Sequence, residues 1–139
     1  MTPPVQFLDL GTALHQDERG FVFFPFQGLT EAFPREEMCA SLHLISILSG
    51  QVRGQHQHPH KTEWLYIYHG QGRLFWRLPG QERQDRLLQD NRTLVVIAPG
   101  IPHALLNEGT EPLYLLAWRA AAPGEQAEVD TVSAPLLEI

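Results

Sequence analysis

The stretch Gly50-Gln-Val-Arg-Gly-Gln-His56-Gln-His58-Pro-His-Lys-Thr-Glu63-Trp-Leu-Tyr-Ile-Tyr-His-Gly70 contains two histidines separated by one residue, and a carboxylate follows them. Side chains of a strand alternate between two faces, so a strand here places His56 and His58 on the same face. Glu63 comes past the next turn, and a third imidazole, His103, stands on a later strand. Three imidazole nitrogens and one carboxylate oxygen suit a divalent transition metal and leave coordination positions open for water or substrate.

The spacing of this stretch resembles the first motif of the cupin family, whose fixed positions are occupied here by Gly50, His56, His58, Glu63 and Gly70. The second cupin motif is matched at Gly100, His103 and Asn107. It departs at Arg92, where a glycine is usual, and at Ala98, where a proline is usual. The resemblance implies an all-β fold, the cupin jelly roll or β-barrel. We expect one domain over residues 1–139, with a core at about 5–119 and a C-terminal tail at 120–139.

Composition agrees with one globular domain, because 43% of the 139 residues are hydrophobic and 19% are charged. A net charge of −6 argues against a non-specific nucleic-acid surface. The sequence offers neither an apolar leader after Met1 nor a run long enough to span a bilayer, so we expect a cytoplasmic protein. Cys39 is the only cysteine, which excludes an internal disulfide, and we expect it to be a small buried residue.

Short apolar runs separated by glycine and proline predict an all-β sandwich or barrel. The expected strands lie near Gln6–Leu10, Phe21–Phe26, Ser41–Leu48, Gln51–His58, Glu63–His69, Gly72–Leu78, Arg83–Leu88, Thr93–Ile97, His103–Asn107 and Pro112–Arg119. A helix of one or two turns is expected between Thr30, a plausible N-cap, and Met38, with Pro34 limiting its length.

Alternation places Glu63, with Leu65 and Ile67, on the inner face of its strand. Trp64, Tyr66 and Tyr68 then point outward and would form an exposed apolar patch, which usually marks an interface, so we expect a homodimer. The alternative is that amino-terminal strands of the same chain cover these aromatic side chains.

A second resemblance covers residues 16 to 119 and points to the sugar-nucleotide cupins. The stretch Gln16–Phe26 looks like their Asp-x-Arg-Gly-x-Phe, and Arg53-Gly54-Gln-His56 is similar to their Arg-Gly-x-His. The pattern is most similar to the capsular-polysaccharide cupins, and it also resembles the dTDP-4-dehydrorhamnose 3,5-epimerases. The resemblance implies a sugar-nucleotide substrate, with Arg19 and Arg53 as contacts to its phosphate or carboxylate groups. The 3,5-epimerases work without metal, using a histidine that matches His56 and a late tyrosine, but no tyrosine follows Tyr114 here.

The histidine cluster therefore has two interpretations. In the first, His56, His58, Glu63 and His103 hold a divalent metal such as zinc, manganese, iron or nickel. In the second, they form a polar cavity whose histidines hydrogen-bond one another and carry protons. His43 shares a face with apolar neighbours and is read either as a core histidine or as a pocket wall, and we prefer the core.

Three functions remain open for a small-molecule protein with no nucleic-acid or membrane partner. The first is an isomerase or epimerase of a keto sugar nucleotide in polysaccharide biosynthesis, with His56, His58 and His103 as catalytic residues. The second is an iron or manganese dioxygenase, and the third is a non-catalytic binding domain. We favour the isomerase.

Overall fold

The computed structural model describes residues 3–27, 33–121 and 131–137 of the chain. Its helical elements and strands are η1 (Gly11–Ala13), α1 (Arg35–Ser41), β1 (Val5–Asp9), β2 (Leu14–Asp17), β3 (Gly20–Phe23), β4 (His43–Ile47), β5 (Val52–Gln57), β6 (Lys61–His69), β7 (Gly72–Trp76), β8 (Gln84–Leu88), β9 (Thr93–Ile97), β10 (His103–Leu106), β11 (Leu113–Ala121) and β12 (Val132–Ser133).

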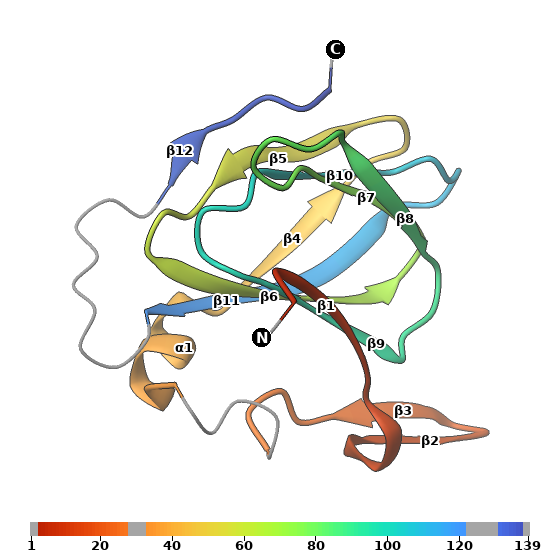
Figure 1. The fold of residues 1–139 in the computed structure, drawn as a ribbon. Coiled ribbons are helices and arrows are strands. Elements are labelled where there is room, and N and C mark those ends of the chain that lie inside the picture. Colours follow the sequence, from red (N-terminus) through yellow and green to blue (C-terminus); the bar gives the residue numbers. More distant parts are fainter. Residues whose placement is uncertain (1–2, 28–32, 122–130, 138–139) are drawn as a thin grey trace.

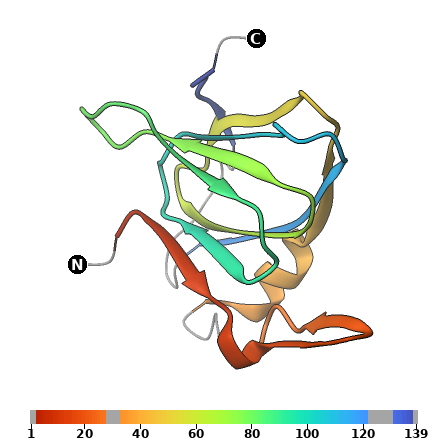
Figure 2. The same cartoon turned by 90° about the vertical axis from the view of Figure 1, so that its right-hand side faces the viewer.

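Two antiparallel five-stranded sheets face each other and form the barrel (Figures 1 and 2). The first sheet has the order β1-β9-β6-β11-β4, and the second has the order β12-β5-β10-β7-β8. Between them lies an apolar core that includes Leu65, Ile67, Leu74, Ile97 and Leu115. The all-β cupin-like fold that the sequence predicts is confirmed.

The outer face of the first sheet carries a second apolar layer. Trp64 and Tyr66 are 2% and 1% exposed, because the β2–β3 hairpin and α1 pack over them with the first strands of the chain (Figure 1). Phe23 packs against Tyr66, with ring centroids 4.6 Å apart. The expectation that these aromatic side chains are exposed is wrong, and the alternative, cover by amino-terminal segments of the same chain, holds.

Local structure in the amino-terminal part differs from the prediction in three places. The hairpin adds a strand at Leu14–Asp17 that the sequence did not predict, and it ends at Phe23 rather than continuing to Phe26. The helix begins at Arg35, after Pro34, rather than after Thr30, since proline is tolerated at a helix start; Thr30 lies outside the described residues. Cys39 is exposed on this helix, so its predicted burial is wrong.

The C-terminal segment returns to the barrel. β12 pairs with β5, and the side chain of Gln55 accepts hydrogen bonds from the backbone of Leu136 and Leu137. Leu136 is buried as a result. Among the described residues there is no helix of the length and apolar character needed to cross a bilayer.

Candidate active site

A bulge in β5 sets the position of the histidines. His103 on β10 is paired with His56, and the next residue of β10, Ala104, is paired with Gly54, so Gln55 is the extra residue of β5. Gln55 has a positive φ of 59° and Gly54 one of 96°. A side chain at position 54 would lie 3.1 Å from the carbonyl oxygen of His103, so the close approach of β5 to β10 requires glycine here. The two strands thereby bring the rings of His56 and His103 to 4.9 Å between centroids.

Glu63 is the centre of the polar cluster. It projects from β6 into the barrel and is 3% exposed. Its Oε1 lies 2.8 Å from His103 Nε2 and its Oε2 lies 3.0 Å from His58 Nε2. Burial alone would raise the pKa of Glu63, but the hydrogen bonds from His103 and His58 outweigh it and hold the pKa below its usual range. Glu63 is therefore a carboxylate that holds two imidazole rings.

The far sides of these two rings are also held. The ring of His103 donates from Nδ1 to the carbonyl oxygen of Ile101 at 2.9 Å. Because Nε2 faces a carboxylate and Nδ1 faces a carbonyl, both nitrogens need a hydrogen when both bonds form. His58 Nδ1 lies 3.3 Å from the hydroxyl of Thr131, which comes from the returning C-terminal segment. The orientation of both rings is thus determined by partners on either side.

His56 differs from its neighbours because it is only half-buried and lines the pocket. Burial, and next the charge of His103, lower the pKa of His56 from 6.5 to about 4, while Glu63 acts in the opposite direction. At neutral pH His56 is therefore a neutral imidazole that can accept a proton.

The four residues could also hold a metal ion. One ligand atom from each of His56, His58, Glu63 and His103 lies within 4.8 Å of the others. The donor set of three imidazoles and a carboxylate fits a divalent transition metal. Glu63 also lies at hydrogen-bond distance from His58 and His103, and a bound ion would replace these two contacts.

The pocket lies between the two sheets. Its polar side is formed by His43, Arg53, His56, Glu63, His103 and Arg119, and its apolar side by Ile45, Ile47, Leu65, Leu105 and Leu115. This enclosed part has a volume of about 60 Å³, and it adjoins a groove of about 690 Å³ between β4 and β5. His43, Ile45, Arg53, Gly54 and His56 line both, so the groove is the entrance to the pocket.

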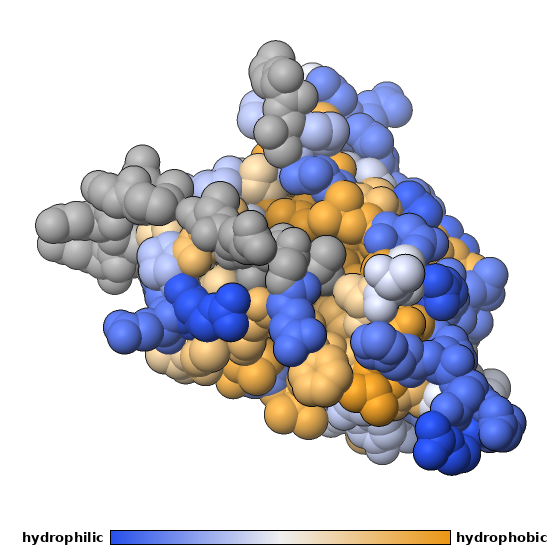
Figure 3. All heavy atoms as spheres, turned by 90° about the horizontal axis from the view of Figure 1, so that it is seen from below, coloured by the Kyte–Doolittle hydropathy of each residue, from blue (hydrophilic) through white to orange (hydrophobic). Residues whose placement is uncertain are grey.

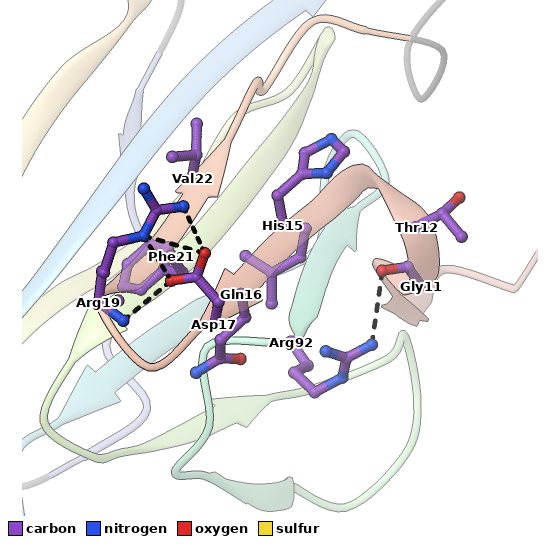
Figure 4. A pocket seen from close by; sticks show the side chains of 11 residues that line it. Gly11, Thr12, His15, Gln16, Asp17, Arg19, Phe21, Val22 and Arg92 are labelled. Carbon is purple, nitrogen blue, oxygen red and sulfur yellow. Dashed lines mark hydrogen bonds and ion pairs between the residues drawn. The ribbon is translucent and has the colours of Figure 1, made fainter.

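The two predicted substrate arginines lie in different places. Arg53 stands at the groove, where its Nε donates to the carbonyl oxygen of Ser46 at 2.9 Å. Arg19 is on the β2–β3 hairpin, with its side chain 84% exposed and paired to Asp17 at 2.6 Å. Figure 4 shows Arg19 bent back onto Asp17 beside a surface hollow that also includes Arg92. Within one chain, Arg19 is not among the residues that line the barrel pocket.

Sequence reasoning missed one residue of the pocket, Arg119, and preferred the wrong one of two alternatives for another, His43. Arg119 lies opposite Glu63 in the β6–β11 pairing, with Nη1 3.4 Å from Oε2 of Glu63. Only the strand register brings them together, and no local pattern announces it. His43, which we expected in the core, is half-buried and lines the pocket. Strand alternation correctly placed His43 on the same inward face as Ile45. It did not indicate that the barrel is hollow at this end.

Asn107 supports the site from the opposite end of β10. It is fully buried, and its amide donates to the carbonyl oxygens of Ile47 and Glu111 at 2.8 and 2.9 Å. Its Oδ1 accepts from the backbone N–H of Gly109 at 2.8 Å. Asn107 therefore holds the turn after β10 against β4.

The fold is similar to the folds of several solved proteins. The chain is similar to QdtA, a sugar 3,4-ketoisomerase from Thermoanaerobacterium thermosaccharolyticum solved in complex with TDP, at 17% identity and a TM-score of 0.70, with 96% of this chain and 90% of that chain covered. It is similar to a 3,4-ketoisomerase from Helicobacter canadensis at 15% identity and a TM-score of 0.71, with 93% and 90% covered. The capsular polysaccharide assembling protein CapF from Staphylococcus aureus matches at 20% identity and a TM-score of 0.59, over 68% of this chain and 26% of that one.

These likenesses confirm the resemblance to sugar-nucleotide cupins that the sequence motifs indicate. No curated protein sequence matches the chain. The family described as the polysaccharide biosynthesis C-terminal domain matches residues 15–132, and the chain therefore belongs to this family.

Proposed function

We propose that the protein is an isomerase that moves a carbonyl group between neighbouring carbons of a keto sugar nucleotide. The observation that carries the proposal is a neutral, half-buried imidazole, His56, at the mouth of a pocket beside His103, whose ring is held by Glu63. The similar folds support it, because three of them belong to sugar ketoisomerases and one of those proteins was solved with TDP-4-keto-6-deoxyglucose.

The enclosed pocket is too small for a whole nucleotide sugar, so we place the sugar ring at the histidines and the nucleotide in the groove. A guanidinium suits a diphosphate because it presents several donors in a planar arrangement. Arg53 lies at the groove and would exchange its bond to Ser46 for a phosphate oxygen. Arg19 stays a proposed contact only if the hairpin meets a substrate that extends beyond the barrel.

The reaction is a pair of proton transfers with no net oxidation. His56 takes the proton from the carbon beside the carbonyl, and the electron pair of that C–H bond forms a C=C bond as the carbonyl becomes an enolate. His58 and His103 are the proposed catalytic partners, since Glu63 holds both rings and both lie next to the ring of His56. His56 then returns the proton to the former carbonyl carbon. The new carbonyl forms at the carbon that lost the proton, as the hydroxyl proton of that carbon passes to the former carbonyl oxygen.

A divalent metal fits the same site and is the finer part of the proposal. His56, His58, Glu63 and His103 would hold it, and it would supply polarisation of the substrate carbonyl. The same donor set suits iron or manganese, which keeps a dioxygenase as the second candidate.

The test uses the chain purified without chelator or nickel resin, and elemental analysis gives its metal content. TDP-4-keto-6-deoxyglucose is added and the products are followed by NMR, before and after dialysis against EDTA. Formation of a positional keto isomer, lost in His56→Asn, is the expected result. Conversion that survives dialysis assigns the chemistry to proton carriers, and conversion that is lost and restored by one metal assigns that metal. Oxygen consumption without isomerisation would replace the proposal with the dioxygenase.

We further infer a cytoplasmic homodimer. An apolar strip runs over the outer face of the first sheet from Leu44 across Leu116 and Tyr68 to Phe21. Leu44 is 71% exposed and Phe21 is 37% exposed. Apolar side chains gather on the underside of the molecule (Figure 3). A contiguous apolar strip of this kind usually marks an interface, and a second copy of the chain is the proposed occupant.

A further inference from the structure

The C-terminal strap, residues 131–137, lies along the edge of β5 that faces away from β10 (Figure 1). Its strand β12 pairs with β5 in antiparallel register, with Ser133 opposite His56. The backbone N–H of Ala134 then donates to the carbonyl oxygen of Gln55 at 2.8 Å. The strap therefore follows the part of β5 that carries the first histidine of the motif, although the two segments lie far apart in the sequence.

The side chain of Gln55 fastens the strap to the barrel. Its Oε1 accepts hydrogen bonds from the backbone N–H groups of Leu136 and Leu137, both at 2.8 Å, and its Nε2 donates to the carbonyl oxygen of Leu137 at 3.0 Å. Arg83 Nη1 donates to the carbonyl oxygen of Leu136 at 2.9 Å, and the side chain of Leu136 is buried. Because the amide oxygen of Gln55 faces two donors and its nitrogen faces an acceptor, one orientation of the amide satisfies all three contacts.

Gln55 is also the residue of the β5 bulge whose backbone is strained. Its φ of 59° lies in the left-handed region, which is unfavourable for a residue with a β-carbon. Such a conformation persists only where the surrounding structure holds it, and such outliers gather at functional sites. Here the strap holds it, through contacts to both the backbone and the side chain of Gln55. The next residue is His56, so the strap supports the bulge that places the rings of His56 and His103 4.9 Å apart.

The first residue of the strap reaches the second histidine of the motif. The hydroxyl of Thr131 lies 3.3 Å from Nδ1 of His58, whose side chain is buried. A hydroxyl both donates and accepts hydrogen bonds, so this contact suits His58 whether its Nε2 faces Glu63, as in this structure, or a metal ion. One end of the strap thus contacts a ring that Glu63 holds from the other side, and the opposite end is fastened to Gln55.

We propose, on the basis of the isomerase function above, that the C-terminal strap is a positioning element of the active site and that Gln55 and Thr131 are its positioning residues. Gln55 keeps the bulge in its left-handed conformation and fastens the strap, and the fastened strap brings the Thr131 hydroxyl to His58. The residues that line the pocket and the groove include neither Gln55 nor Thr131, so both act through the histidines rather than on the substrate. The strap therefore affects how fast the sugar reacts and not how tightly it binds.

Two variants break the strap contacts without removing a catalytic group. Gln55→Asn introduces a residue that tolerates the left-handed conformation, but its shorter side chain no longer reaches the backbone of Leu136 and Leu137. Thr131→Val keeps the shape of the side chain and loses the hydroxyl. Thr131→Ser retains the hydroxyl, and Ser133→Ala, at an exposed position of the same strap, is the matched control.

Two measurements are made on each protein. The first gives kcat and KM for isomerisation of TDP-4-keto-6-deoxyglucose, followed by NMR. The second is the 15N spectrum of the imidazoles in protein labelled at histidine, which reports the hydrogen bond at Nδ1 of His58 without any substrate; His58→Asn identifies the signals of this ring. We expect kcat to fall roughly 10-fold in Gln55→Asn and in Thr131→Val, with KM within a few-fold of the wild type, because both variants remove the support of a functional imidazole. The Nδ1 signal of His58 should move in both variants, whereas Thr131→Ser and Ser133→Ala should match the wild type in both measurements.

A double variant tests whether the two residues act together. Since either substitution breaks the same contact to His58, Gln55→Asn combined with Thr131→Val should lower kcat no further than Gln55→Asn alone. A wild-type kcat or an unmoved His58 signal in either single variant would overturn the proposal, as would losses of kcat that multiply in the double variant. If Gln55→Asn does not fold, Thr131→Val and its comparison with Thr131→Ser decide the outcome. A wild type that does not isomerise the substrate refutes the proposed function, whereas the imidazole spectra still decide whether the strap holds His58.

Discussion

Asn107→Asp is the sharpest single-atom test of the structure. The substitution replaces the amide nitrogen with oxygen and keeps the shape of the side chain. That nitrogen donates to two carbonyl oxygens, of Ile47 and Glu111, inside a residue that is fully buried. Only this orientation of the amide satisfies both carbonyls and the N–H of Gly109. In the variant, a carboxyl group faces two acceptors, so it must stay protonated to remain in place.

The cost can be worked out from these contacts. The protonated carboxyl group of the variant restores one donor and leaves one buried carbonyl unpaired, which costs about 1–2 kcal/mol. The folded state then raises the pKa of this carboxyl above its unfolded value of about 3.9, so the folded chain binds the proton more tightly than the unfolded chain. Stability is therefore lost as pH rises, by about 1.4 kcal/mol per pH unit until the raised pKa is reached. We expect a total loss of about 3 kcal/mol at pH 5 and about 6 kcal/mol at pH 7.

Urea unfolding of the wild type and Asn107→Asp at several pH values between 4.5 and 7 measures this loss. Asn91→Asp, at the half-buried turn before β9, is the matched control and should stay within about 0.5 kcal/mol of the wild type. A loss below about 1 kcal/mol in Asn107→Asp, with no dependence on pH, would show that the amide does not make these buried bonds.

Four further predictions concern the site and the surface. Since the pKa of His56 is about 4, kcat/KM for isomerisation should not fall near pH 6.5 as pH is lowered, and a pH–rate profile with an acid limb at 6.5 would contradict the role of His56 as the base. As pH is lowered from 6.5 to about 4, the free energy of unfolding of the wild type should fall, because the unfolded chain takes up the proton that folded His56 excludes. In urea unfolding, His56→Asn should show a weaker dependence of this free energy on pH. Arg53→Ala should raise KM for the nucleotide sugar roughly 10-fold with little change in kcat. The control Arg77→Ala, at another exposed position, should leave KM and kcat unchanged. Equal KM values for the two variants would remove Arg53 from the nucleotide site. Leu44→Asp should convert the homodimer to a monomer in light scattering, whereas Val132→Asp on the other sheet should not, and a wild type that is monomeric refutes the interface.

The spacing of His56, His58 and Glu63 could be read from the sequence because it depends on local geometry. Strand alternation places His56 and His58 together, and glycines before and after the motif permit the turns. Alternation also gave the inner face of β6, with Glu63, Leu65 and Ile67 directed to the barrel. The same rule predicted that Trp64 and Tyr66 point outward from the barrel. It did not predict which segments cover them, because that depends on where residues far away in the sequence pack.

By itself, the sequence determined the all-β class, the family resemblance and the cluster of His56, His58, Glu63 and His103, because these follow from short-range periodicity and motif spacing. The tertiary structure alone decided which distant residues join that cluster. Arg119 contacts Glu63 through the register of β6 and β11, and His43 faces the pocket because the barrel is hollow at the end where β4 begins. Register between strands depends on packing over the whole barrel, and a short motif carries no information about it.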